Sequence, residues 1–279
     1  MKIRQMTVSD LDFVLNLTAL EGWNSTRRDF EELLHFNPKG SFIGEVDGKA
    51  AGMVTTVNYG EFGFIGNLIV QNIYRGQNFG RFLMGVAMKY LLDCGTKSLL
   101  LDGVPKAVSL YKQLGFRKIS KSLRLESSLK GKELHHTRSM TENDLRKIAS
   151  IDSEYFGGQR EDFLRMRFSE YPELARVIEK DDEIQGFIMG SCSGSSVRIG
   201  PWVMNAHNEL AEQLLLEFAG IVEGTTLKIG ILESNVQALQ LLGRHGFKER
   251  SHSWRMLYGE DIEATLSDHL YAICCPARG

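Results

Sequence analysis

The spacing of apolar and polar residues in the first half of the chain predicts a hairpin of two strands. Residues 41–46 and 50–58 form two largely apolar runs, and Asp47 and Gly48 between them suit the positive backbone angles of a tight turn. Residues 65–70 follow as another apolar run. We expect all three runs to be β-strands.

The next segment changes from the period of a strand to that of a helix. Residues 77–92 carry apolar side chains at broadly helical spacing, and the apolar run 98–101 comes after them. This order predicts a β-loop-α-β unit. The second half has corresponding segments at 196–203, 208–222 and 226–231.

Two sequence patterns occur once in each half, in the same order. Arg-x-Met-Thr-x-x-Asp-Leu begins at Arg4 and again at Arg138, an offset of 134 residues. Ala-x-x-Leu-x-x-x-x-Gly-Phe begins at Ala107 and at Ala238, an offset of 131 residues. Two repeated patterns separated by nearly the same number of residues indicate a tandem duplication. The polar segment 127–133 would link the two copies. The Thr and Asp of the first pattern also predict a helix start in each half.

Composition is that of a folded globular protein, with 43% hydrophobic and 24% charged residues among 279. A net charge of -2 gives no broad attraction to nucleic acid or to an anionic membrane. No stretch approaches the roughly 18 apolar residues of a membrane span, so we expect a cytoplasmic protein. Its four cysteines lack the paired spacing of zinc sites, and we expect no metal.

Glycine and arginine residues gather at the predicted strand-to-helix turn after residue 70. The amide groups at a helix start lack partners inside the helix and bind phosphate well. Gly76 and Gly80 allow a close approach of the backbone, while Arg75 and Arg81 add positive charge. The turn therefore predicts an anion site, although a purely structural turn is the other reading.

The stretch from Arg75 to Gly80 resembles motif A of the GNAT acetyltransferases, Gln/Arg-x-x-Gly-x-Gly/Ala. Asn78 stands where the pattern has its first glycine, and Asn tolerates left-handed backbone angles better than most residues. The resemblance implies that the backbone of Leu68, Ile69 and Val70 lines the pantetheine arm and acetyl group of acetyl-CoA. It implies a pyrophosphate cradle made by Arg75, Gly76, Gln77, Asn78, Phe79, Gly80 and Arg81.

A dinucleotide-binding Rossmann site is the alternative interpretation of this turn, and Asp102 falls near the distance of the acidic residue in that motif. The hairpin before the turn and the Gly-Phe pattern after it favour the acyltransferase. The resemblance then predicts an α/β (α+β) fold of two tandem GNAT-like domains. Each domain would have a mixed, mostly antiparallel twisted sheet flanked by helices, with boundaries at 1–128 and 134–279.

The segment from Pro105 to Phe116 resembles GNAT motif B, Asn-x-x-Ala-x-x-Leu-Tyr-x-x-x-Gly-Phe, with Val104 at the usual Asn position. Many family members use the matching tyrosine to protonate the departing thiolate. The resemblance thus implies that Tyr111 is the general acid. The alternative is that Tyr111 only packs its ring and anchors its hydroxyl.

A general base must remove a proton from the attacking amine. Glu21 is the candidate, because the corresponding loop of GNAT enzymes commonly forms a wall of the acceptor site. Trp23 and Asn24 in the same loop would then contact the acceptor. A solvated Glu and a packed Trp are the plainer interpretation.

The second half departs from the family patterns at the positions that carry chemistry. Leu242 stands at the position of Tyr111, and the turn at 200–208 lacks the Arg-Gly-x-x-x-Gly arrangement. This half resembles the degenerate C-terminal domain of tandem GNAT proteins. We expect it to support the first half or to shape its acceptor pocket, with Trp202, Asp152 and Arg160 as lining candidates.

Taken with the resemblance, these residues predict an N-acetyltransferase that transfers an acetyl group from acetyl-CoA to a primary amine by direct attack. The acceptor would be a small molecule or a peptide. The alternative is a non-catalytic acyl-CoA-binding regulatory module. The sequence leaves the acceptor, the acyl-chain preference and the oligomeric state open.

Overall fold

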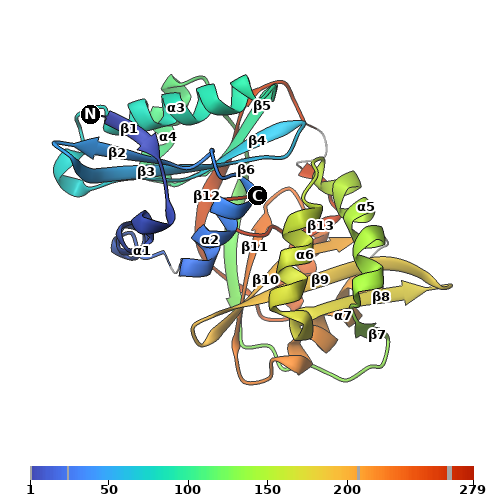
Figure 1. The fold of residues 1–279 in the computed structure, drawn as a ribbon. Coiled ribbons are helices and arrows are strands. Elements are labelled where there is room, and N and C mark those ends of the chain that lie inside the picture. Colours follow the sequence, from blue (N-terminus) through green and yellow to red (C-terminus); the bar gives the residue numbers. More distant parts are fainter. Residues whose placement is uncertain (1, 24, 206–207, 263–265) are drawn as a thin grey trace.

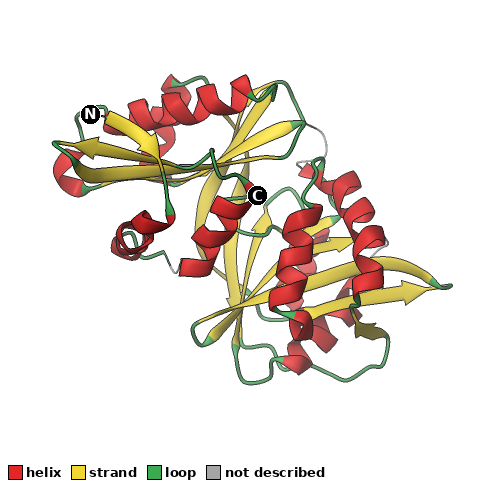
Figure 2. Cartoon of the chain, viewed as in Figure 1, coloured by secondary structure: helices red, strands yellow, loops and turns green. Residues whose placement is uncertain are grey.

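The computed structural model describes residues 2–23, 25–205, 208–262 and 266–279. Its two halves form two lobes that are joined by long shared strands (Figure 1). Within the described ranges the strands make one 13-stranded sheet, with helices on both of its faces (Figure 2). The predicted mixed α/β fold is confirmed. No described helix is long and apolar enough to cross a membrane.

The first half contains the predicted hairpin and the predicted β-loop-α-β unit. Its strands are β1 (Lys2–Gln5), β2 (Phe42–Val46), β3 (Lys49–Asn58), β4 (Phe62–Val70), β5 (Ser98–Gly103) and β6 (Arg117–Ser127). Its α-helices are α1 (Leu11–Leu20), α2 (Arg27–Phe36), α3 (Phe79–Asp93) and α4 (Val108–Gln113). Helix α3 covers one face of β3 and β4, and α1 and α2 lie on the opposite face (Figure 1).

The second half repeats this order of elements. Its strands are β7 (Thr137–Ser139), β8 (Ala175–Lys180), β9 (Glu183–Ser193), β10 (Ser196–Met204), β11 (Thr226–Leu232), β12 (Lys248–Gly259) and β13 (Leu270–Ala272). Its α-helices are α5 (Leu145–Phe156), α6 (Glu161–Glu170), α7 (Asn208–Ile221) and α8 (Val236–Arg244). The duplication inferred from the sequence is therefore visible in the fold.

The repeated Arg-x-Met-Thr-x-x-Asp pattern has the same structural role in both halves. Arg4 donates to both carboxylate oxygens of Asp10 over 2.7 Å, and Arg138 does the same to Asp144 over 2.7 and 2.8 Å. Each aspartate also accepts from the backbone N–H of the threonine three residues before it. The pattern thus fixes the first turn before α1 and before α5 by satisfying free amides.

The last long strand of each half pairs with strands of the other half. The strand order runs β4-β5-β12-β6-β11-β10, so β12 separates β5 from β6, and β6 pairs with β11. The register places Arg255 of β12 opposite Asp102 of β5, and Leu125 of β6 opposite Ile229 of β11. The halves of the sequence are consequently joined by two exchanged strands, which the sequence alone did not predict.

Candidate active site

A cavity of about 900 Å³ lies where the two halves meet. It extends from the turn between β4 and α3 to strands β6, β10, β11 and β12 and to the segment 274–278. This volume is within the range of known small-molecule and cofactor sites. Both halves therefore build one cavity.

The cavity begins where β4 and β5 separate. These parallel strands pair only from Phe62 opposite Ser98 to Ile65 opposite Leu101. Strand β4 continues to Val70 without β5 beside it, and residues 66–70 all line the cavity. The backbone of β4 thus presents an edge that an extended ligand can follow.

A β-bulge changes the direction of this edge. Asn67 and Leu68 of β4 together oppose Val54 of β3, because the register shifts between Met53 and Thr55. Asn67 has a positive φ of 50°, and its side-chain Nδ2 donates to Thr55 Oγ1 over 3.1 Å. Bulges are over-represented next to active sites, where they re-aim a side chain or end the pairing of strands.

The turn from β4 to α3 has the geometry of an anion cradle. Gly76 and Asn78 have positive φ angles of 77° and 63°, so the left-handed conformation expected for Asn78 is observed. A Cβ atom at Gly76 would meet no atom within 4 Å, which leaves open space beside the start of α3. The side chain of Arg75 is fixed beside this turn because its Nε donates to the Val70 carbonyl over 2.8 Å.

The structure brings the residues predicted for the coenzyme to this cavity, with one exception. The lining includes Leu68, Ile69, Val70, Arg75, Gly76, Asn78, Phe79, Gly80 and Arg81. Gln77 is not among the lining residues, because its exposed side chain turns back to donate to the Ile73 carbonyl over 3.2 Å.

Tyr111 of α4 lines the same cavity and is 7% exposed. Burial raises the pKa of its hydroxyl to about 12, which keeps it protonated at neutral pH. Its ring lies against Gly103, where an added Cβ would be 2.7 Å from Cε2. Within the described residues the Tyr111 hydroxyl has no hydrogen-bond partner, so it is free to donate to a ligand.

Glu21 lines the cavity but is held by two cations. Arg75 Nη2 donates to one carboxylate oxygen, and Lys106 Nζ donates to the other over 2.6 Å. The hydrogen bond from Lys106 and the charge of Arg75 lower the pKa of Glu21. A carboxylate in this state is a weak base, so the geometry speaks against the role predicted for Glu21. Trp23 lines the cavity, and Asn24 lies outside the described residues.

Residues 274–278 of the second half form the wall of the cavity beside the β4 bulge. A Cβ atom at Gly66 would lie only 2.4 Å from the Ala277 carbonyl oxygen, so this segment touches β4 directly. Tyr59 Oη donates to the Arg278 carbonyl over 2.8 Å, and the Arg278 guanidinium pairs with Glu32. Residues of the second half therefore form part of the wall of this cavity.

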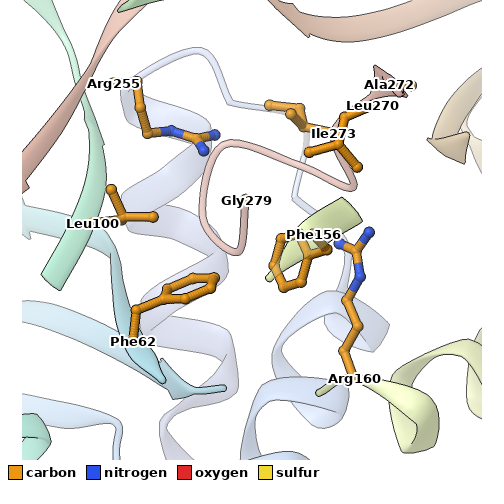
Figure 3. A pocket seen from close by; sticks show the side chains of 9 residues that line it. All are labelled: Phe62, Leu100, Phe156, Arg160, Arg255, Leu270, Ala272, Ile273 and Gly279. Carbon is orange, nitrogen blue, oxygen red and sulfur yellow. The ribbon is translucent and has the colours of Figure 1, made fainter. Parts of the chain in front are cut away.

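The residues predicted for this wall are not the ones that form it. Trp202 is fully buried against Tyr271, and Asp152 and Arg160 form a buried ion pair at 2.7 Å. Arg160 instead borders a small void of about 10 Å³, where it and Arg255 stand on opposite sides of the segment ending at Gly279 (Figure 3). The prediction failed because the burial of these side chains depends on the packing of distant elements.

A buried polar network lies at the floor of the cavity, on the exchanged strands. Asp102 Oδ1 accepts from Arg255 Nε over 2.5 Å, and Asp102 Oδ2 accepts from Ser122 Oγ over 2.8 Å and from Arg124 Nη2 over 3.4 Å. Burial alone would raise the pKa of Asp102, but the charge of Arg255 lowers it overall. One carboxylate thus accepts hydrogen bonds from two guanidinium groups.

Sequence reasoning missed several charged residues of the cavity. They come from β5, the turn before α4, β6, β10, β11 and the segment 274–278: Asp102, Lys106, Arg124, Arg198, Lys228 and Arg278. A polar residue at the end of an apolar strand was a usable signal for Asp102. The others lie on segments whose partners are distant in sequence, and no local pattern marks them.

The described residues of the second half include no counterpart of Tyr111. Leu242 is fully buried in the core of that half and offers no proton donor at the position equivalent to Tyr111. The turn between β10 and α7 includes residues 206–207, which lie outside the described ranges. The described His, Cys, Asp and Glu side chains form no group of three or more that could hold a metal ion.

Both halves match models of acetyltransferase families. Residues 11–116 match the model described as "Acetyltransferase (GNAT) family", and residues 148–272 match the one described as "Acetyltransferase (GNAT) domain". The chain is similar to holothin acyltransferase of Pseudoalteromonas sp. (strain SANK 73390), with 24% identity over 250 residues. That match covers 86% of this chain and 82% of the relative.

Solved structures share the complete two-lobed fold. A putative acetyltransferase from Pyrococcus horikoshii superposes with a TM-score of 0.81 at 23% identity, covering 100% of this chain and 95% of that one. A tandem GNAT protein from the clavulanic acid biosynthesis pathway superposes with a TM-score of 0.65 at 14% identity, covering 94% and 99%. At these identities the likeness concerns the fold.

Proposed function

We propose that this chain, which belongs to the GNAT acyltransferases and carries two GNAT domains in tandem, transfers an acetyl group from acetyl-CoA to a primary amine. The chemistry would take place in the first half. The observation that supports this most directly is that the cradle, the β4 bulge and Tyr111 line one cavity.

The cradle residues would hold the pyrophosphate of the co-substrate. Amide groups at the start of α3 and the side chain of Arg81 supply donors and positive charge, and the space beside Gly76 leaves room for a phosphate. The edge of β4 from Gly66 to Val70 would then take the pantetheine arm by backbone hydrogen bonds.

The residues around the bulge would act on the thioester. A backbone N–H of β4 near Leu68 would polarise the thioester carbonyl and stabilise the charge that develops when the amine attacks. The Tyr111 hydroxyl would donate a hydrogen bond to the departing sulfur. With a pKa of about 12 against about 8.5 for an ordinary thiol, complete transfer of the tyrosine proton would cost about 5 kcal/mol. Hydrogen-bond stabilisation of the thiolate is therefore its main contribution.

Glu21 would serve as a positioning residue and not as the base. Its ion pairs with Arg75 and Lys106 fasten the loop after α1 to the cradle and to the turn before α4. The proton of the attacking amine would then leave through water in the cavity. This assignment replaces the one made from the sequence.

A thiol-release assay over amines, amino acids and peptides would test the proposed function, with coenzyme binding measured in parallel by calorimetry. We expect turnover with at least one amine and one coenzyme bound per chain. Tight binding without turnover of any acceptor would support a binding module, and two coenzymes per chain would contradict the assignment to the first half.

A matched pair of variants on α3 would test the cradle. Arg81→Glu places a negative charge in the cavity and should weaken coenzyme binding by at least about 10-fold, or about 1.4 kcal/mol. Lys89→Glu changes an exposed residue of the same helix that does not line the cavity, and it should leave binding unchanged. Equal effects of the two changes would contradict the cradle.

A further inference from the structure

The cavity is positively charged although the chain has a net charge of -2. Eight Lys and Arg residues but only four Asp and Glu residues are among its described lining. Arg75, Arg81 and Lys106 belong to the cradle side, where the coenzyme accounts for them. The other five belong to the opposite end: Arg124, Arg198, Lys228, Arg250 and Arg278. The proposed coenzyme leaves this second group of cations unexplained.

The centre of this group is a row of charged residues across three paired strands. Arg198 of β10 is the register partner of Lys228 of β11, and Lys228 is the register partner of Glu126 of β6. Register partners extend from the same face of a sheet, with Cβ atoms about 5 Å apart. All three residues line the cavity. We call Arg198, Lys228 and the nearby Arg124 the cationic wall.

The acidic residues near the cationic wall are already engaged. Glu126 accepts from Arg250 Nε over 2.6 Å, and Asp29 lies 3.7 Å from Arg198 Nη1. Asp102 serves both Arg124 and Arg255. These pairs do not neutralise the wall, because one carboxylate is shared between two guanidinium groups and Lys228 adds a further charge.

Lys228 has no counter-ion within the described part of the chain. Its side chain is partly buried, and among the described residues it makes no ion pair and no hydrogen bond. A cation that is withdrawn from water without a partner loses solvation free energy. An anion bound beside Lys228 would offset this loss of solvation by forming an ion pair with the ammonium group.

Arg124 extends the wall along β6, where it is the register partner of Gly230. Its Nη1 lies 3.6 Å from the position that a Cβ atom would take on Gly230, so the guanidinium passes over a strand position without a side chain. Gly230 is two residues beyond Lys228 on β11 and faces the same side. Burial lowers the pKa of Arg124, although the charge of Asp102 opposes this effect.

The wall is connected to the proposed acyl-transfer point by the segment 273–277. The Ile273 N–H donates to the Gly230 carbonyl over 2.9 Å, and Ala277 touches Gly66 beside the bulge. Four residues span at most about 14 Å even when fully extended. A small molecule lying along this segment can therefore reach both places at once.

We propose that the cationic wall binds an anionic group of the acceptor, so that the acceptor is a primary amine that also carries a carboxylate or a phosphate. This inference rests on the proposed function, and it adds the chemical class of the acceptor. Lys228 and Arg198 would bind the anion, while the amine would lie at the β4 bulge beside the acetyl group.

Three matched amines would test this inference: 5-aminopentanoate, 5-aminopentyl phosphate and pentylamine. Thiol release from acetyl-CoA gives kcat/KM for each, and calorimetry with CoA present gives binding without turnover. We expect kcat/KM at least 10-fold higher for one of the anionic amines than for pentylamine. Which anionic amine is better distinguishes a carboxylate from a phosphate.

Variants of two lysines that flank Glu126 supply the control. Lys228→Gln should remove most of the preference for the anionic amine, chiefly through KM, and Lys228→Arg should keep it. Lys248→Gln changes the other register partner of Glu126, which is exposed and does not line the cavity, and should leave the preference intact.

Two results would overturn the inference while leaving the proposed function standing: equal use of pentylamine and both anionic amines, or an unchanged preference in Lys228→Gln. If none of the three amines is acetylated, the calorimetry still decides. If an anionic amine binds and Lys228→Gln weakens that binding at least 10-fold, the result supports the cationic wall. If the anionic amines and pentylamine bind with equal affinity, the result contradicts it.

Discussion

Arg255 Nε lies 2.5 Å from Asp102 Oδ1, and this ion pair connects β12 of the second half to β5 of the first. The Asp102 side chain is fully buried, and that of Arg255 is 3% exposed. Asp102 of this pair also lines the shared cavity. The exchanged strands therefore link the stability of the two halves to the shape of the site.

Asp102→Asn should destabilise the whole chain. Asparagine retains the shape of the side chain but leaves the guanidinium groups of Arg255 and Arg124 buried without their counter-charge. Removing one partner of a buried pair costs about 3–5 kcal/mol. Urea unfolding should show this loss, with both halves unfolding in one transition, because the exchanged strands belong to both.

Asp93→Asn is the control for that experiment, since Asp93 forms an exposed ion pair with Lys89 on α3. Its unfolding curve should match that of the unchanged protein. Equal midpoints for Asp102→Asn and Asp93→Asn would mean that the buried pair does not hold the halves together.

Tyr111→Phe should reduce kcat by about 100-fold, because the departing thiolate loses its hydrogen-bond donor. Coenzyme affinity should remain within about 2-fold, since the ring still fills its place against Gly103. Steady-state kinetics and calorimetry measure the two effects. Tyr90→Phe removes a hydroxyl that donates to Asn37 over 2.6 Å outside the cavity, and it should leave kcat unchanged. An unchanged kcat in Tyr111→Phe would remove this residue from the mechanism.

The raised pKa of Tyr111 also predicts the alkaline behaviour of kcat. A hydroxyl with a pKa of about 12 keeps its proton as the pH rises through 10, so the hydrogen-bond donor is lost only near pH 12. The profile of kcat with a saturating amine should show no fall between pH 7 and 10 due to this group. A decline near pH 10 that disappears in Tyr111→Phe would contradict the burial of the hydroxyl.

Glu21→Gln distinguishes a positioning residue from a base. The change removes a negative charge beside Arg75 and Lys106, so the anionic coenzyme should bind several-fold more tightly at low salt, and kcat should change by less than about 10-fold. Glu61→Gln, at an exposed position outside the cavity, serves as the control. A fall in kcat of about 100-fold or more would restore Glu21 as the base.

The lowered pKa of Asp144 predicts how the free energy of unfolding depends on pH. The hydrogen bonds from Arg138 lower its pKa from 3.8 to about 2. A carboxylate whose pKa is lowered in the folded state contributes stability above pH 3.8 and loses it as the pH falls through 2, up to about 2 kcal/mol here. Asp144→Asn should therefore be less stable than the unchanged protein at pH 6, and the difference should shrink toward pH 2 in urea unfolding. A difference that stays constant with pH would contradict this pairing.

The sequence by itself determined the local elements and the side of the cavity around the β4-α3 turn. The hairpin, the β4-α3 turn and the position of Tyr111 depend on contacts between residues close in the chain, where turn residues and helical periodicity act directly. The left-handed angle at Asn78 follows from the same local chemistry. The duplication was readable because each Arg-x-Met-Thr-x-x-Asp pattern closes its own helix start.

The tertiary structure alone decided which strands became neighbours, and hence the composition of the cationic wall. Backbone ladders are nearly independent of side-chain identity, so nothing local assigned β12 to β5 or β6 to β11. Arg198, Lys228 and Arg124 became one surface only through that pairing. Glu21 likewise looked available as a base in the sequence, and only the fold placed two cations against it, because charge interactions depend on distance in space and not along the chain.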